Sequence, residues 1–167
     1  AGDEVLLSGP LYTARDAAHQ RLCRCLQEGK PLPVELAGET IYYMGPSPAK
    51  PGEVIGSAGP TTSGRMDAMS PRLLDLGNKI MIGKGKRDAA VKEAVVRNGA
   101  VYLAALGGAG ALMAQSVKTL EVIAWPDLGC EAVRRLTVED MPLTVILDAH
   151  GGDLYESGPE AYKTSGC

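Results

Sequence analysis

Three short loops each place a basic side chain beside glycines, at the start of a segment that is expected to be helical. Their sequences are GPLYTARD (9–16), GPTTSGRMD (59–67) and GKGKRD (83–88). A helix N-terminus already carries partial positive charge and free N–H groups, so a further cation is unfavourable there unless an anion binds. Glycine also lets the backbone approach a ligand closely. We therefore expect the three loops to converge on one edge of the domain and form an anion pocket.

The chemistry of the three cations suggests what the anion would be. Arg15 and Arg65 can each grip a carboxylate with two parallel N–H groups, and Lys84 adds a point charge. Such a set would suit a ligand with two carboxylates. The alternative is that the acidic residues in the same loops neutralise their neighbours and the loops are only turns; these residues are Asp16, Asp67 and Asp88. Spacing alone leaves both interpretations open.

Other motifs carry weaker signals. Residues 107–110 (GGAG) follow an apolar run but lack the third glycine of a dinucleotide-binding loop, since Met113 occupies its place. Lys84 is followed by Gly85, where a phosphate-binding loop requires Ser or Thr. A nucleotide site is therefore disfavoured. His19 lies in a predicted helix, where a satisfied core or surface histidine is the default interpretation.

Composition excludes several classes of function. The net charge of −3 argues against a general nucleic-acid or membrane-surface binder, and no apolar run is long enough for a membrane span. The cysteines match neither zinc spacings nor ferredoxin motifs, and they are expected to be free thiols, with no metal bound; they are Cys23, Cys25, Cys130 and Cys167. Free thiols indicate a reducing compartment, so we expect a cytoplasmic location and no membrane partner.

Short β-like runs alternate with helical ones, which predicts a single α/β domain over 1–167 with a mixed sheet. Thr13 is the expected N-cap of a helix that ends at Gly29, and Ser70 is the expected N-cap of a second helix. A third helix is expected at 88–98, closed by Gly99. Strands are expected at 4–7, 40–44, 79–82, 100–106, 120–124, 133–138 and 144–148.

A resemblance to a known family covers nearly the whole chain. It rests on SGPLYTARDAAH (8–19), YYMGPSP (42–48), GPTTSGRMD (59–67), IGKGKR (82–87) and LGCEAVRRLTVEDMPLTVILDAHGGDLY (128–155). In this order they resemble the β subunit or C-terminal domain of class I, iron–sulfur-dependent fumarate hydratases and L-tartrate dehydratases. One departure is Lys86, where family members often have asparagine.

The resemblance implies a fold and a set of site residues. The fold would be the swivelling β/β/α three-layer domain. The substrate carboxylates would be bound by Arg15, Arg65 and Lys84. The catalytic residues would be Thr61 and Lys84. An unperturbed threonine hydroxyl is a poor base, so the role of Thr61 in proton transfer remains open. Secondary candidates in the same motifs are His19, Thr62 and Arg87. Arg134 and Arg135, in a strand remote from the motifs, should tolerate replacement by lysine.

The resemblance also implies a partner. In that family a [4Fe–4S] cluster is held by cysteines of the α subunit or N-terminal domain, and this chain would bind none. The implied function is reversible hydration of fumarate to (S)-malate in a site shared with the α subunit, within a higher αβ oligomer. One alternative is dehydration of L-tartrate to oxaloacetate. Another is a non-catalytic anion-binding domain.

Overall fold

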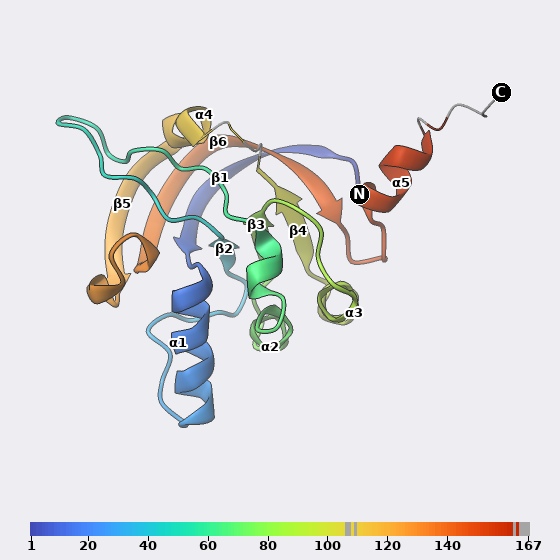
Figure 1. The fold of residues 1–167 in the computed structure, drawn as a ribbon, viewed down its shortest axis with the longest axis horizontal. Helices are drawn as coiled ribbons and strands as arrows, with labels where there is room; N and C mark the ends of the chain where they lie inside the picture. Colours follow the sequence, from blue (N-terminus) through green and yellow to red (C-terminus); the bar gives the residue numbers. More distant parts are fainter. Residues whose placement is uncertain (106–107, 109, 162, 164–167) are drawn as a thin grey trace.

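The computed structural model of the chain describes residues 1–105, 108, 110–161 and 163. These residues form a mixed six-stranded sheet with helices packed against it (Figure 1). The strands are β1 (Glu4–Thr13), β2 (Thr40–Tyr42), β3 (Ile80–Gly83), β4 (Val101–Ala104), β5 (Val117–Ala124) and β6 (Val133–Leu147). The expected α/β class with a mixed sheet is confirmed.

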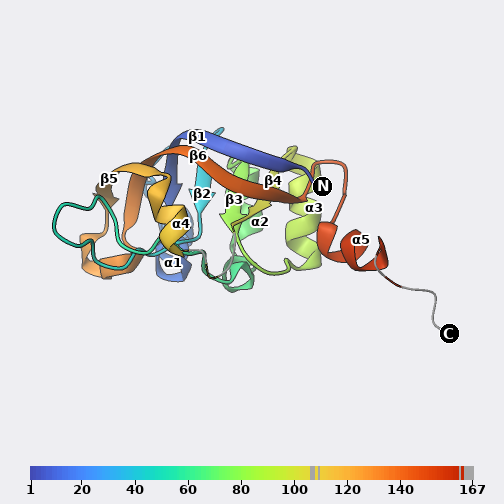
Figure 2. The same ribbon diagram turned by 90° about the horizontal axis from the view of Figure 1, so that it is seen from above.

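Most of the strands pair in a closed ring. The order is β1-β2-β3-β4-β6-β5, with an additional pairing between β1 and β6. β1 to β4 run parallel to one another, while β6 is antiparallel to β1, β4 and β5. Seen from above, β1 and β6 lie side by side along their length (Figure 2). Five strands therefore form a ring, and β5 extends it on one side.

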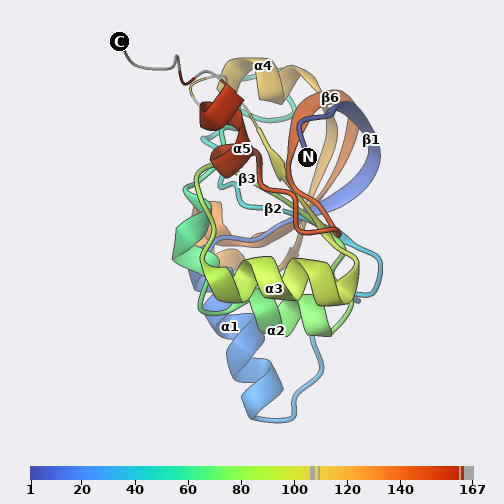
Figure 3. The same ribbon diagram turned by 90° about the vertical axis from the view of Figure 1, so that its right-hand side faces the viewer.

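Two hydrophobic cores lie on opposite sides of the short parallel strands. Helices α1 (Asp16–Gln27), α2 (Ser70–Asp75) and α3 (Ala89–Asn98) group together on one side (Figure 3). Their apolar faces enclose the first core, which includes Leu22, Met81 and Val95. The long strands β1 and β6 arch over the other side and enclose the second core, together with α4 (Gly110–Gln115). Helix α5 (Leu154–Ala161) lies at the end of the molecule near the N-terminus.

Local capping explains where α3 begins and ends. The Asp88 carboxylate accepts a hydrogen bond from Val91 N at 2.9 Å, which satisfies one of the free N–H groups of the first turn. Gly99 closes the helix in the left-handed conformation, with φ 57°. The predicted helix and its end at Gly99 are confirmed, whereas Asp88, expected inside the helix, is its N-cap.

The first strand is longer than predicted, because β1 continues to Thr13 where the sequence indicated only 4–7. Thr13 is therefore a strand residue and not an N-cap; its hydroxyl is buried with no partner, and Arg15 occupies the N-cap position of α1. Ser70 is likewise the first residue of α2, and Met69 precedes it as N-cap. The hydroxyl of Ser70 donates instead to Met66 O at 2.9 Å.

The two strands expected at 133–138 and 144–148 are one continuous strand, β6. The polar residues between them mark a bend and not a turn. Asp140 has a positive φ of 50°, and the pairing of β1 with β6 shifts register between Leu7 and Gly9. Ser8 Oγ accepts a hydrogen bond from Asp140 N at 2.9 Å, so both strands bend at the same place. The strand expected at 100–106 is β4, shorter at both ends, and position 106 lies outside the described residues.

Because β1, β2, β3 and β4 are parallel, their carboxyl ends meet at one edge of the sheet. The connections that follow them carry the residues singled out in the sequence: Arg15 after β1, Thr61 to Arg65 after β2, and Lys84 after β3. Ligand sites commonly lie at the carboxyl ends of parallel strands, in closed barrels as well as in open sheets.

Candidate anion-binding site at the carboxyl ends of the parallel strands

The loop that carries Thr61 and Arg65 is joined to the ends of β2 and β3 by backbone hydrogen bonds. Thr61 N donates to Tyr43 O at 2.7 Å, and Ser63 N donates to Lys84 O at 2.9 Å. Thr62 and Lys84 face each other in a parallel bridge. The 3-10 helix Ser63–Met66 (η1) begins directly afterwards and contains Arg65. The structure thus brings two of the three predicted loops into direct contact.

A buried hydroxyl locks this junction. Ser63 Oγ lies 2.8 Å from Tyr102 Oη and accepts from Lys84 N at 3.1 Å. Burial raises the pKa of Tyr102, so its hydroxyl keeps its proton and donates to Gly85 O at 3.0 Å. A methyl group at Gly83 would lie 2.0 Å from Ser63 Oγ, so only glycine fits there. The backbone of Lys84 is held on both sides by these contacts.

Lys84 lines a hollow of about 300 Å³, and the other residues that line it have small side chains or none. The lining residues are Gly45, Ser47, Ser57, Gly59, Pro60, Lys84, Gly108 and Gly110. Lys84 is half-buried, and within the described part of the chain its ammonium makes no ion pair. The hollow therefore combines backbone groups with one available cation, which is the composition of an anion subsite.

Arg15 reaches the same edge from β1. A methyl group built on Gly45, which lines the hollow, would come within 3.0 Å of Arg15 Cδ. Arg15 Nε lies 3.5 Å from Asp16 Oδ1, and Arg65 Nη1 lies 4.0 Å from Asp16 Oδ2. The carboxylate of Asp16 thus stands between the two guanidinium groups. Arg15, Arg65, Thr61, Thr62 and Lys84 therefore belong to one region.

A second carboxylate approaches Arg15. Glu131 Oε1 lies 3.4 Å from Arg15 Nη2, and Glu131 Oε2 accepts from Ala17 N at 2.8 Å. Arg15 Nε and Asp16 Oδ1 are buried without a hydrogen bond that meets normal geometry. Arg15 is therefore oriented by two carboxylates, and one of its N–H groups, at the buried Nε, has no hydrogen-bond acceptor.

Arg87 lies elsewhere. Its side chain is fully buried, with Nε 2.6 Å from Asp67 Oδ1 and Nη2 donating to Ser70 Oγ at 2.8 Å. The guanidinium also faces the rings of Tyr43 and Tyr102, at 5.3 and 5.0 Å from their centroids. These contacts place Arg87 in the interior, between the sheet and α2, and away from the open edge.

His19 is also interior. Nδ1 lies 3.0 Å from Arg15 O, and because a carbonyl can only accept, Nδ1 carries the proton and donates. Burial lowers the pKa of His19 to about 4, partly opposed by this hydrogen bond. The imidazole is therefore neutral near pH 7; it hydrogen-bonds the backbone of Arg15 and packs edge-on against the ring of Tyr43.

The three acidic residues of the motifs make different kinds of contact. Asp67 pairs with Arg87 of a different loop and not with its neighbour Arg65, whereas Asp16 pairs with its neighbour Arg15, as the neutralising interpretation expected. Asp88 instead caps α3, and Asp16 lies between Arg15 and Arg65. Neutralisation by an acidic neighbour therefore applies in the Arg15 loop, and Arg15, Arg65 and Lys84 nevertheless lie at one edge.

A family model described as Fumarase C-terminus matches residues 1–158. The chain belongs to the fumarase C-terminus family. It is 40% identical over 152 residues to "Fumarate hydratase class I, anaerobic" of Escherichia coli, covering 90% of this chain and 28% of that protein. It is 39% identical over 160 residues to "Fumarate hydratase 2" of Leishmania major, covering 92% and 28%. A "Putative L(+)-tartrate dehydratase subunit beta" of Methanocaldococcus jannaschii is 40% identical over 161 residues, covering 93% and 83%.

The chain thus spans about 28% of the length of the fumarate hydratases that it matches. In this fumarase C-terminus domain, the described residues contain no group of three or more His, Cys, Asp or Glu side chains that could hold a metal ion. Cys23 and Cys25 are half-buried on α1 and Cys130 is exposed, all as free thiols, while Cys167 lies outside the described residues. The three described thiols are not grouped as ligands of an iron–sulfur cluster would be. No helix in the same residues is long and apolar enough to cross a membrane.

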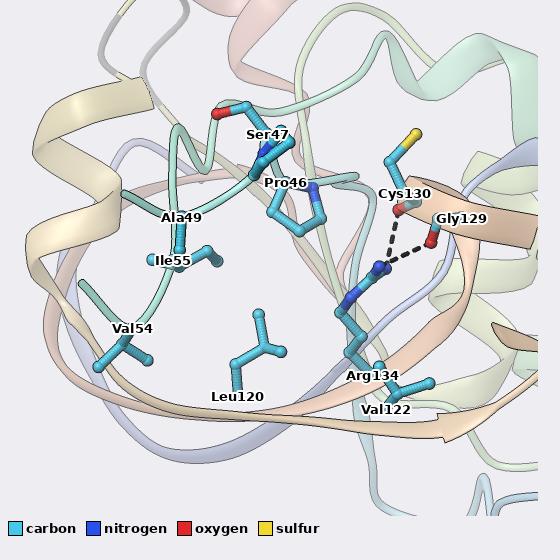
Figure 4. Close-up of a pocket in the computed structure, with 11 residues that line it drawn as sticks. Pro46, Ser47, Ala49, Val54, Ile55, Leu120, Val122, Gly129, Cys130 and Arg134 are labelled. Carbon is cyan, nitrogen blue, oxygen red and sulfur yellow. Dashed lines mark hydrogen bonds between the residues drawn. The ribbon is translucent and has the colours of Figure 1, made fainter. Parts of the chain in front are cut away.

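The fumarase C-terminus domain also has a hollow of about 390 Å³ behind the 46–55 loop (Figure 4). There Arg134 points toward the turn that precedes β6, and donates to Gly129 O at 2.6 Å and Cys130 O at 2.9 Å. A third bond joins it to Ala132 O at 3.0 Å. The expectation that Arg134 and Arg135 lie in a strand remote from the motifs is wrong, because they pair with Thr13 and Tyr12 of the first motif across β6 and β1. The turn that Arg134 holds also carries Glu131.

Sequence reasoning missed Glu131, Ser63 and Tyr102. Glu131 lies more than a hundred residues from Arg15 along the chain, so no local spacing connects them. Ser63 and Tyr102 are ordinary core residues by type, and only the pairing of β3 with β4 brings Tyr102 beside Lys84. The family resemblance of the segment 128–155 was the one signal that could have drawn attention to Glu131.

Proposed function

We propose that this chain binds and orients the substrate of a hydro-lyase that interconverts fumarate and (S)-malate, in an active site completed by a partner. The observation that carries the proposal is the meeting of Arg15, Arg65 and Lys84 at the carboxyl ends of parallel strands, beside a glycine-lined hollow. A C4 dicarboxylate presents two anionic ends, and this edge offers separate cations for both. The names of the relatives, which include fumarate hydratases of class I, support the same reaction class.

The cations have a chemical purpose beyond binding. Dehydration removes a proton from the carbon next to one carboxylate, so negative charge builds on that carboxylate as the proton leaves. A fixed guanidinium or ammonium group stabilises that charge more in the transition state than in the ground state. We assign Arg65 and Lys84 to this carboxylate, because they lie on the two loops joined by the Thr62–Lys84 bridge. Arg15 then binds the other carboxylate.

Thr61 is proposed as the residue that holds a proton near the reacting carbon. Its amide is fixed by the bond to Tyr43 O, and its side chain is half-buried beside Pro60, which lines the hollow. Thr62 is exposed and is proposed to shape the loop through its bridge to Lys84. His19 and Arg87 are proposed to act from the interior as supports, His19 for the backbone of Arg15 and Arg87 for the η1–α2 segment.

The rest of the proposed enzyme is an α subunit or N-terminal domain, to which we assign the [4Fe–4S] cluster and its Lewis-acid chemistry. The described residues of this chain do not offer ligands for it, so its steps belong to the partner. We further propose an assembly of several αβ units in the cytoplasm, which the free thiols support. The helical layer, the parallel strands and the arch of β1 and β6 support the swivelling β/β/α description.

L-Tartrate dehydration is the second candidate. The specific observation in its favour is that a protein named as a tartrate dehydratase β subunit aligns over 83% of its own length with this chain. Both substrates are C4 dicarboxylates, so the three cations suit either. The extra hydroxyl of tartrate would need an additional hydrogen-bonding partner.

Co-expression with the α partner under anaerobic conditions, followed by assays with fumarate, malate and tartrate, tests the proposal. Turnover of fumarate and malate with little turnover of tartrate is the expected result. Preferential turnover of tartrate would establish the second candidate. A correctly assembled complex with full cluster content that turns over none of the three would leave the non-catalytic anion-binding domain as the better description.

A further inference from the structure

Glu131 joins two parts of the chain that are far apart in sequence. It lies at the end of the 3-10 helix Pro126–Glu131 (η2), which connects β5 to β6. Its two carboxylate oxygens both face the start of α1: Oε2 accepts from Ala17 N at 2.8 Å, and Oε1 lies 3.4 Å from Arg15 Nη2. The same side chain therefore holds the helix and the guanidinium in one geometry.

The start of α1 needs this outside support. Arg15 occupies the N-cap position, but no side chain at that position caps the helix. The first N–H groups of a helix require acceptors, and a carboxylate there also interacts favourably with the helix dipole. Glu131 supplies that acceptor from another element, and in doing so places its second oxygen beside Arg15.

The backbone on either side of Glu131 is held by hydrogen bonds from Arg134. Arg134 donates to the carbonyl groups of Gly129 and Cys130 (Figure 4). It also donates to Ala132 O, so its acceptors lie on both sides of Glu131 in the sequence. On the far side, the Arg15 side chain packs against Gly45. A methyl group on Gly45 would come within 2.9 Å of Cys130 O and 3.2 Å of Arg15 Nη1. Arg15 is therefore confined between the Gly45 backbone and the η2 turn.

We infer that Glu131 is a positioning residue that fixes the guanidinium of Arg15 for one substrate carboxylate. It acts through Arg15. The inference rests on the proposed function only in taking a carboxylate as the ligand of Arg15. Removing its charge should leave Arg15 present but poorly oriented, and misplacement of a binding group by a fraction of an ångström is costly.

The neighbouring pair Asp127–Arg21 provides a matched control. Asp127 also lies in η2 and Arg21 also lies in α1, with Arg21 Nη1 donating to Asp127 Oδ1 at 2.9 Å. Asp127→Asn therefore weakens a different contact between the same two elements, η2 and α1, without touching Arg15. Glu131→Gln keeps the shape and an acceptor for Ala17 N, but loses the charge beside Arg15.

Both variants are to be measured in the complete complex with its partner. For Glu131→Gln, we expect KM for the dicarboxylate to rise between about tenfold and a hundredfold with little change in kcat, because Arg15 is assigned to the spectator carboxylate. Asp127→Asn should stay within about twofold of the parent. Arg15→Lys should cost less in the Glu131→Gln background than in the parent, because the two residues act as a unit. An unchanged KM for Glu131→Gln, or an equal rise for Asp127→Asn, overturns the inference.

Crystal structures of the variants test the role of Glu131 without a measurement of turnover. In Glu131→Gln, the Arg15 side chain should leave its position between Gly45 and the η2 turn or occupy several positions. Arg134→Lys, which loosens the same turn by another route, should produce a smaller displacement. An Arg15 that stays ordered in its place in both variants refutes the inference. A parent complex inactive toward all dicarboxylates would refute the proposed function while this measurement still tests Glu131.

Discussion

Arg87 and Arg65 come from similar stretches of sequence but have opposite environments. Each follows a glycine-containing loop with an aspartate one or two residues later. The Arg87 side chain is 0% exposed and bonded to Asp67 and Ser70. The Arg65 side chain is 56% exposed, and its ion pair with Asp16 is 4.0 Å long. One guanidinium has its partners inside the protein, and the other faces solvent at the edge where the strands end.

The difference shows that one arginine stabilises the fold, while the other is available for binding at the edge. The Arg87 network ties η1 and α2 to the segment after β3, so it holds the frame behind the site. The edge in front keeps cations that internal groups satisfy only in part. A substitution behind the edge should therefore change stability first, and a substitution on the edge should change binding or rate first.

The largest effect should come from breaking the interior network. Arg87→Met leaves the Asp67 carboxylate without its charged partner, which typically costs about 3–5 kcal/mol of the free energy of unfolding. Chemical denaturation of the complex should show this loss. The matched control is Arg97→Met, which removes an exposed pair with Asp75 and should cost no more than about 1 kcal/mol. Equal losses in the two variants would contradict the assignment of Arg87 as a buried support.

A loss of similar size should follow from acid. His19 has a folded pKa of about 4, below the ordinary 6.5, because burial disfavours its charged form. Between pH 4 and pH 6.5 the unfolded chain binds this proton more readily than the folded chain does. The neutral His19 therefore makes its full contribution to the free energy of unfolding above pH 6.5, and this contribution is lost as the pH falls to about 4. The loss is on the order of 3 kcal/mol. His19→Phe should flatten this part of the stability profile, while His150→Gln, at an exposed position, should not.

On the open edge, Arg65→Lys should reduce turnover and leave stability nearly unchanged. An ammonium group cannot reproduce the two parallel N–H bonds of a guanidinium, and a charged hydrogen bond contributes about 1.5–3 kcal/mol, or roughly one to two powers of ten in kcat/KM. Because charge builds on the carboxylate assigned to Arg65, kcat should fall as well. Exposed Arg135→Lys is the control. A normal kcat/KM for Arg65→Lys with full cluster content would remove Arg65 from the site.

The smallest effect should come from Gly45→Ala. Its φ is not in the left-handed region, so the added methyl group acts only by crowding Arg15 Cδ at 3.0 Å and Cys130 O at 2.9 Å. A displacement of Arg15 should weaken dicarboxylate binding by about fivefold, equivalent to ~1 kcal/mol. Titration calorimetry of the complex would measure it. Gly158→Ala in α5, where the nearest atom is 3.7 Å away, should bind normally.

Much of this arrangement could be predicted where the cause is local. Asp88 and Gly99 cap α3 through groups a few residues away, and the cations after β1 and β3 meet because parallel strands share an edge. Thr13 has the chemistry of an N-cap, but its pairing with Arg134 across β1 and β6 keeps it in the strand. The interior place of Arg87 depends on Asp67 and Tyr102, which the sheet brings together from different elements. No periodicity in the sequence encodes that meeting.

The closed ring of strands has a consequence for how the chain folds. β1 pairs with β6 from Glu4 opposite Thr144 to Thr13 opposite Arg134, so the first strand finds its partner only when the last has been made. During synthesis β1 must leave the ribosome and wait with one edge unpaired, while the helical connections can form early. Contacts of such long sequence separation give a high contact order and slow folding. An unpaired β1 edge also exposes N–H and C=O groups with which a strand of another chain can pair.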